Sequence, residues 1–131
     1  MKPEELMARA KLAMENAYAP YSNFQVGAAL LGADGTVYTG CNVENAAYSP
    51  TLCAERVALG KAVSSGCREF VALAVCGGKN GEIAGACTPC GVCRQVLSEF
   101  CKEDFPVYVT EGSGKLQCYT LAQLLPAQFC L

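Results

Sequence analysis

The chain has 131 residues, of which 52% are hydrophobic and 17% are charged, and its formal net charge is −2. Globular proteins carry about 25% charged residues on average, and this apolar composition excludes disordered, collagen-like and coiled-coil chains. The basic residues are scattered singly, which argues against a nucleic-acid partner. The low fraction of charged residues favours burial of some surface against another subunit. A chain of this length is expected to form a single domain over residues 1–131.

The N-terminus predicts no targeting or membrane segment. Residues 1–6 read MKPEEL, which lacks an apolar stretch of signal-peptide length. No apolar run in the chain approaches the 18 residues that a membrane helix requires. A cytoplasmic protein with no membrane partner is therefore expected.

The predicted elements alternate between helices and strands. The first half is expected to contain a helix from Pro3 to about Tyr18, strands over 24–31 and 36–41 that flank an Asp34-Gly35 turn, an irregular segment over 42–51, and a helix from 52 to about 64. The second half is expected to contain a buried strand over 70–76, a glycine-rich loop over 77–89, a helix from 90 to about 102, strands over 106–110 and near 115–119, and a short helix over 120–125. This order favours an α/β fold with helices packed around a central sheet.

Ten cysteines are present and histidine is absent. In a short secreted chain ten cysteines would indicate a disulfide framework. Without a signal peptide, most of them are expected to be reduced and some to be metal ligands. The absence of histidine excludes Ser-His and Cys-His nucleophilic pairs, which need an imidazole base. A metal site in this chain must therefore consist of thiolates and carboxylates.

Three cysteines lie at the predicted starts of two helices. Cys53 begins the segment Cys-Ala-Glu, while Cys90 and Cys93 belong to Pro-Cys-Gly-Val-Cys. Unpaired N–H groups and the helix dipole stabilise a thiolate at such positions. If the two helix starts face each other, three thiolates meet, and Zn²⁺ can bind them with a fourth position left for water. The pattern favours an open catalytic zinc site, with a redox pair or buried structural thiols as alternatives.

Glu55 lies two positions after Cys53, close enough to stand beside the metal without binding it. A carboxylate there can move protons between water and a substrate; its alternative role is to complement the helix dipole. Three thiolates overcompensate the charge of Zn²⁺ and make water at the metal a poorer acid. Hydrogen bonds from Arg56, and from Gln95, are expected to restore that acidity.

The chain resembles the small homotetrameric cytidine deaminases over almost its whole length. Three blocks carry the resemblance: residues 19–30 (APYSNFQVGAAL), residues 40–49 (GCNVENAAYS) followed by CAER at 53–56, and residues 89–95 (PCGVCRQ). A lone CxxC would be a weak signal, but the combination with the preceding Glu55 motif is specific. The resemblance implies a three-layer α/β/α sandwich with a mixed five-stranded central sheet.

The resemblance also implies a function and a role for each matched residue. The reaction is the hydrolytic deamination of cytidine and 2′-deoxycytidine to uridine and 2′-deoxyuridine, which serves pyrimidine salvage. The zinc ligands are Cys53, Cys90 and Cys93, with one Zn²⁺ per subunit, and Glu55 carries protons to the pyrimidine. The implied substrate contacts are Phe24, Asn42, Glu44, the Ala54 backbone N–H, Tyr48 and Phe129. Tyr48 and Phe129 match positions that reach a neighbouring subunit's pocket, so the active sites of a homotetramer would be shared.

Two features keep alternative functions open. Cys87 creates a second CxxC register with Cys90, although Pro89 favours Cys90 and Cys93 as the ligands. With Cys87 as a fourth ligand, the site would be closed and the chain a structural zinc module or a pseudoenzyme. Another deaminase of the same scaffold, such as a blasticidin S deaminase, is the other alternative, and the intact pair Asn42 and Glu44 argues against it. The segment 77–89 is longer than is usual in the family.

Overall fold

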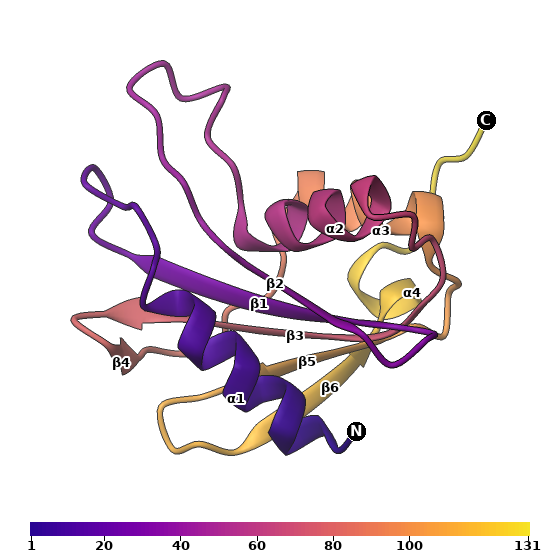
Figure 1. Cartoon of the computed structure of the whole chain (residues 1–131), viewed down its shortest axis with the longest axis horizontal. Coiled ribbons are helices and arrows are strands. Elements are labelled where there is room, and N and C mark those ends of the chain that lie inside the picture. Colours follow the sequence, from indigo (N-terminus) through magenta and orange to yellow (C-terminus); the bar gives the residue numbers. More distant parts are fainter.

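Helices enclose a mixed β-sheet in the computed structural model, which describes residues 1–131 (Figure 1). The helices are α1 (Pro3–Met14), α2 (Ala54–Ser64), α3 (Gly91–Phe100) and α4 (Leu121–Leu124). The strands are β1 (Gln25–Gly32), β2 (Val37–Cys41), β3 (Phe70–Lys79), β4 (Glu82–Ile83), β5 (Pro106–Thr110) and β6 (Leu116–Thr120). None of the helices has the length and apolar character that crossing a bilayer requires.

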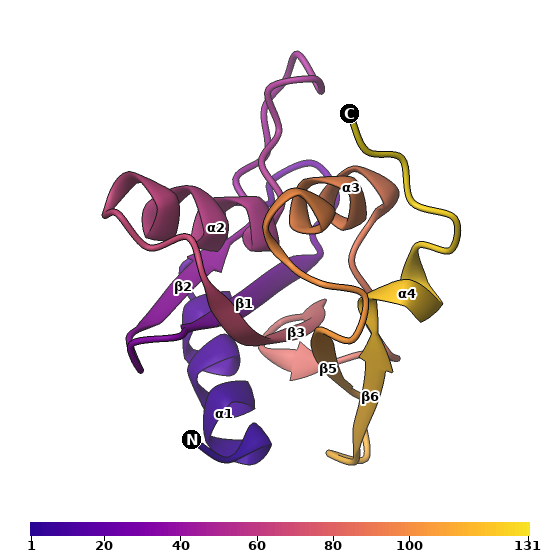
Figure 2. The ribbon, with the colours of Figure 1, turned by 90° about the vertical axis from the view of Figure 1, so that its right-hand side faces the viewer.

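The sheet has the strand order β2-β1-β3-β5-β6, and the short β4 pairs with β3 outside this path. Only β3 and β5 run parallel; the other pairs are antiparallel. Helix α1 covers one face, and α2, α3 and α4 lie on the opposite face (Figure 2). The three-layer α/β/α sandwich with a mixed central sheet is thus confirmed, and the two-residue β4 adds a sixth strand to the five predicted.

The hydrophobic core consists of two clusters, one on each side of the sheet. Successive side chains of a strand point to opposite faces. On β3, Leu73 and Val75 accordingly join the cluster beneath α2 and α3, whereas Ala72, Ala74 and Cys76 join the cluster that packs against α1. Since both faces are covered, the central strands are continuous apolar runs, which is the pattern that predicted the strand over 70–76.

The first helix is shorter than predicted, because it ends at Met14 rather than near Tyr18. The backbone of Tyr18 instead pairs with the segment that follows β2. Its N–H donates to the Asn42 carbonyl oxygen at 2.9 Å, and its own carbonyl accepts from the Glu44 N–H at 2.9 Å. These long-range bonds compete with the intrahelical bonds that continuation of the helix would need.

The glycine-rich segment predicted as a loop over 77–89 is irregular only over 84–89. Strand β3 continues to Lys79, and a two-residue turn, Asn80-Gly81, leads into β4. Both turn residues have positive φ values of 54° and 78°, as a type I′ hairpin turn requires. At Gly77 a Cβ atom would lie 2.6 Å from the Phe24 ring, so the absence of a side chain lets the ring lie against the strand.

Close packing of α2 on β2 depends on Gly40. A Cβ atom on Gly40 would lie 2.6 Å from the Ala58 nitrogen and would also overlap the Ala54 carbonyl oxygen. We expect Gly40→Ala to displace the start of α2 and to lower the free energy of unfolding by about 1–3 kcal/mol. Gly60→Ala in the same helix is the matched control, because nothing lies within 4 Å of the added methyl group. Urea unfolding should show a gain of up to about 1 kcal/mol for the control, and equal stabilities would contradict the packing argument.

Candidate active site

The starts of α2 and α3 carry the three predicted cysteines. Cys53 is the N-cap residue of α2 and Cys90 is the N-cap residue of α3, while Cys93 lies in the first turn of α3. Both N-cap residues have extended backbone angles, and neither helix start is capped by a side-chain hydrogen bond. The predicted position of the thiols at helix N-termini is confirmed, and the partial positive charge of both helices acts on one cluster.

The three sulfur atoms have the spacing that a tetrahedral metal site requires. The Sγ atoms of Cys53 and Cys90 are 3.7 Å apart, those of Cys90 and Cys93 are 3.6 Å apart, and all three lie within 4.8 Å of one another. With Zn–S bonds of about 2.3 Å, two thiolates of a tetrahedral site lie roughly 3.8 Å apart. The donor set therefore fits Zn²⁺ with a fourth position free. Cys87 is not a member of this group, which argues against the closed four-cysteine site.

Arg56 lies beside the cysteine group and balances its charge. Its Nη2 atom donates to Cys53 Sγ at 3.6 Å and to the Thr51 carbonyl oxygen at 3.2 Å. A hydrogen bond from Cys93, together with the one from Arg56, lowers the pKa of Cys53 to about 5. The same hydrogen bond and burial raise the pKa of Cys93. The site therefore stabilises the thiolate form of Cys53, and Arg56 is its counter-charge.

Glu55, Cys53 and Cys90 line a common cavity of about 310 Å³, whereas Cys93 is fully buried. The glutamate is only 5% exposed, and burial raises the pKa of its carboxyl group to about 7. Ala54 also lines the cavity. As the first residue of α2, it has an N–H group that no carbonyl of the helix can accept. A buried carboxyl group and a free N–H donor thus lie at the end of the cavity that holds the thiols.

The segment before β1 also lines the cavity. Phe24 lines it, and Asn42 holds the backbone on both sides of this residue. The Asn42 side chain donates to the Phe24 carbonyl oxygen at 2.9 Å and accepts from the Val26 N–H at 2.8 Å. These bonds leave one amide hydrogen of Asn42 available to a ligand.

Glu44 fixes the same segment through its carboxylate. Its Oε1 atom accepts from the N–H groups of Tyr21 and Ser22 at 2.9 and 3.1 Å, and its Oε2 atom accepts from the Ser22 hydroxyl. The Ser22 side chain and these backbone donors lower the pKa of Glu44. The carboxylate is therefore ionised and preoriented at the cavity, which the spacing of Asn42 and Glu44 alone did not predict.

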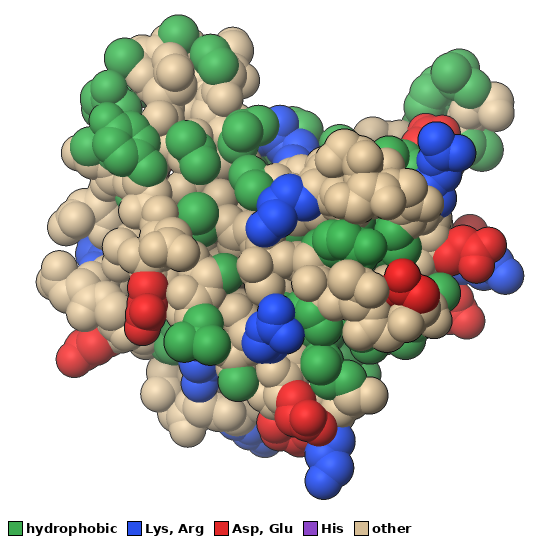
Figure 3. Space-filling view, in the orientation of Figure 1, with side chains coloured by type: hydrophobic (Ala, Val, Ile, Leu, Met, Phe, Trp, Pro, Cys, Tyr) green, Lys and Arg blue, Asp and Glu red, His purple; other side chains and the backbone are tan.

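Five of the predicted site residues do not line this cavity: Tyr48, Arg56, Cys93, Gln95 and Phe129. Tyr48 is 79% exposed and has a φ of 61°, and Phe129 is 67% exposed. The loop between β2 and α2 and the C-terminal segment project from the body on the side of α2 and α3, and hydrophobic side chains cover both (Figure 3). The Gln95 amide donates to the Phe129 carbonyl oxygen at 3.3 Å, so it faces the C-terminal segment. Of the two side chains predicted to donate to the thiolates, only Arg56 does so.

Several cavity residues were not singled out from the sequence. They are Ser22, Val26, Thr51, Leu52 and Thr88. All except Val26 lie in irregular segments, where no periodic pattern indicates which side chain faces inward. For Ser22, the signal that could have indicated a place in the site was its position inside the block at 19–30, which carries the family resemblance.

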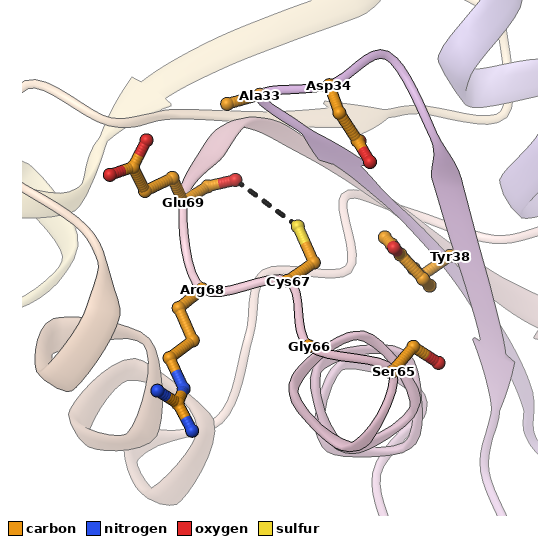
Figure 4. A pocket seen from close by; sticks show the side chains of 8 residues that line it. All are labelled: Ala33, Asp34, Tyr38, Ser65, Gly66, Cys67, Arg68 and Glu69. Carbon is orange, nitrogen blue, oxygen red and sulfur yellow. Dashed lines mark hydrogen bonds between the residues drawn. The ribbon is translucent and has the colours of Figure 1, made fainter.

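A second cavity, of about 390 Å³, lies at the other end of α2 (Figure 4). Asp34, Tyr38 and Cys67 face into it, whereas the charged groups of Arg68 and Glu69 point away from it. The Cys67 thiol donates to the Glu69 carbonyl oxygen at 3.5 Å. This cavity contains no group of three metal-ligating side chains, so the cavity beside Glu55 is the candidate active site.

Three grouped thiols, a Pro-Cys-x-x-Cys segment and a buried glutamate beside them define the zinc-dependent deaminases of bases and nucleosides as a class. The profile of the cytidine and deoxycytidylate deaminase zinc-binding region matches residues 1–109. The chain belongs to this family.

Named relatives agree with this assignment. The chain is 54% identical to a cytidine deaminase of Sporosarcina psychrophila, over 98% of this chain and 92% of the relative. The crystal structure of cytidine deaminase from Burkholderia pseudomallei superimposes with a TM-score of 0.90 at 47% identity, covering 98% of this chain and 100% of the other. A blasticidin-S deaminase of Bacillus cereus is 32% identical over 79% of this chain and 76% of the relative.

Proposed function

We propose that the chain catalyses the hydrolytic deamination of cytidine and 2′-deoxycytidine to uridine and 2′-deoxyuridine, with release of ammonia. One observation carries the proposal: a single cavity is lined by Cys53 and Cys90 of the three-thiol group, by the buried Glu55, and by Asn42 and Glu44. Its volume of about 310 Å³ is at the lower end of the range for small-molecule sites. The relatives described above are named for the same activity.

The proposed chemistry assigns proton transfer to Glu55. Zn²⁺ held by Cys53, Cys90 and Cys93 supplies Lewis-acid activation of a water molecule. The Glu55 carboxylate takes a proton from that water and gives it to N3 of the pyrimidine while the water oxygen bonds to C4. Glu55 then carries the second water proton to the amino nitrogen, and the C4–N bond breaks to release ammonia. The Ala54 N–H holds the carbonyl oxygen of the base.

The cavity lining supports a nucleoside rather than a nucleotide as the substrate. No lysine or arginine lines the cavity, and Glu44 adds a negative charge to its lining. A substrate phosphate would therefore be repelled, whereas ribose hydroxyls can donate to the carboxylate of Glu44 and accept from the Asn42 amide. Phe24 lies between these groups and provides an apolar surface for the base.

The direct test is an ultraviolet absorbance assay of zinc-loaded protein with cytidine, together with measurement of released ammonia. Equal amounts of ammonia and uridine support the proposal. The matching assay with deoxycytidylate tests the argument against a phosphate, and blasticidin S tests the function of the 32% identical relative. Turnover of blasticidin S without turnover of cytidine would replace the proposed substrate.

Glu44→Gln tests the contact with the ribose. Glutamine keeps the oxygen that accepts from Tyr21 and Ser22, but it loses the charge that binds a hydroxyl donor. We expect KM for cytidine to rise roughly 10- to 100-fold, since a hydrogen bond to a charged group contributes about 1.5–3 kcal/mol, with a smaller change in kcat. With 2′,3′-dideoxycytidine the variant and the parent should have similar KM values. An equal rise for both substrates would exclude the ribose contact.

We further propose that four subunits assemble and that Tyr48 and Phe129 complete a neighbour's cavity. The support is their exposure on projecting segments beside the site, and a chain with only 17% charged residues. A strained φ at a bulky exposed tyrosine is a feature of functional positions. Light scattering on the protein and on Phe129→Ala measures the assembly, and a monomeric, active protein would contradict it.

A thiolate zinc site also suits the reducing cytoplasm, where the reaction would salvage pyrimidines.

A further inference from the structure

Cys90 is the most exposed cysteine of the metal-binding group. Cys93 is fully buried within α3, and Cys53 is half-buried and bonded to Arg56. Cys90 is exposed and precedes the first helical residue, where no side chain caps the helix. Packing therefore fixes the position of its sulfur less than that of the other two sulfurs, so another constraint must hold the backbone at Cys90.

Arg94 supplies such a constraint with three guanidinium nitrogens. Its Nε atom donates to the Pro89 carbonyl oxygen at 2.7 Å, and its Nη2 atom donates to Thr88 Oγ1 at 3.1 Å. Its Nη1 atom donates to the Leu124 carbonyl oxygen at 2.6 Å, at the end of α4. The guanidinium thus joins the segment that precedes Cys90 to two helices.

The bond to Pro89 acts directly on the ligand. The Pro89 carbonyl group and the nitrogen and Cα atoms of Cys90 lie in one peptide plane. When Nε holds the carbonyl oxygen, the orientation of this plane is fixed, and only the φ and χ1 rotations of Cys90 remain to move its sulfur. Arginine suits this task because its donors form a rigid planar fork, whereas lysine offers a single point charge on a flexible stem.

We propose that Arg94 is a positioning residue that holds Cys90 in the geometry required for metal binding. The inference rests on the proposed function, since it assumes that the three cysteines bind Zn²⁺. It also links the metal site to the C-terminal segment: Arg94 binds the Leu124 carbonyl, and the adjacent Gln95 binds the Phe129 carbonyl. In Figure 2, α4 and the C-terminal segment run beside α3. Two neighbouring residues of α3 thus hold both α4 and the segment that carries Phe129.

The test measures metal binding by the full-length protein rather than turnover. Co²⁺ is titrated into the zinc-free protein, and Zn²⁺ affinity is measured by competition with a chromophoric chelator. We expect Arg94→Lys and Arg94→Met to weaken Zn²⁺ binding roughly 10- to 100-fold, as loss of the groups that orient metal ligands does in other proteins. The sulfur-to-cobalt charge-transfer bands should shift, because one sulfur moves. Thr88→Val, which removes one of the three acceptors, should cause a smaller loss.

Arg68→Lys is the matched control, since its side chain is exposed and follows the C-terminal end of α2, whereas Cys53 caps the N-terminal end. Thermal unfolding of each zinc-free variant separates folding from metal binding. If Arg94→Met does not fold, Arg94→Lys and Thr88→Val still test the inference. Variants that lose stability but bind Co²⁺ with the parent's affinity and spectrum would overturn it. If the parent protein itself binds no metal, the proposed function fails as well, so the two failures are distinguishable.

Discussion

Glu55→Gln is expected to retain the fold and the bound zinc while losing nearly all turnover of cytidine. Glutamine has the same shape as glutamate, but its amide cannot accept a proton from water and pass it to N3 of the base. Proton transfer by a positioned side chain contributes typically about 10²–10⁴-fold to a rate. We therefore expect kcat to fall by at least about 10²-fold, measured by the absorbance assay with saturating cytidine.

Two controls make this result specific. Zinc content determined by mass spectrometry should equal that of the parent, since Glu55 is not one of the three grouped ligands. Glu69→Gln changes an exposed glutamate and should leave the rate unchanged. Turnover at more than about a tenth of the parent rate in zinc-loaded Glu55→Gln would remove the carboxylate from the proposed proton transfer.

Cys90→Ala is expected to abolish both zinc retention and activity. The variant keeps Cys53 and Cys93, but two protein ligands do not form the three-thiolate site whose spacing the structure shows. Stoichiometric zinc in the parent and less than about a tenth of that in the variant after dialysis against a chelator would support the assignment. Cys118→Ala, at an exposed cysteine outside the group, is the control and should retain zinc.

Retention of zinc by Cys90→Ala would mean that a different thiol completes the site. Cys87 is the nearest candidate in sequence, and it lines the same cavity. The double variant Cys87→Ala/Cys90→Ala would then decide between a replacement ligand and a wrong assignment. Loss of zinc only in the double variant would identify Cys87 as the replacement ligand, whereas retention there would show that neither cysteine is required and that the assignment of Cys90 is wrong.

The sequence by itself determined the chemistry of the site. The absence of histidine excludes imidazole as a metal ligand, and the position of three cysteines at two helix starts predicts thiolate ligands. The role of Glu55 beside the metal was predicted from its distance of two residues from Cys53. The predicted positions of these groups are confirmed, because helix N-caps and short motifs are local and the spacing along the chain fixes where the groups lie once the helix forms. Their roles as metal ligands and proton carrier stay predictions. The covered central strands were predicted for the same reason, since a continuous apolar run is a local signal.

Only the tertiary structure decided where long-range bonds override local patterns. Strand β3 continues through Gly77 because β1 pairs with it, although glycines locally favour a loop. Helix α1 ends at Met14 because Tyr18 bonds to Asn42, and the Gln95 amide turns to Phe129 rather than to a thiolate. The three acceptors of Arg94 lie as far as 30 residues away along the chain. Such contacts depend on which elements meet in three dimensions, and sequence spacing carries no record of that.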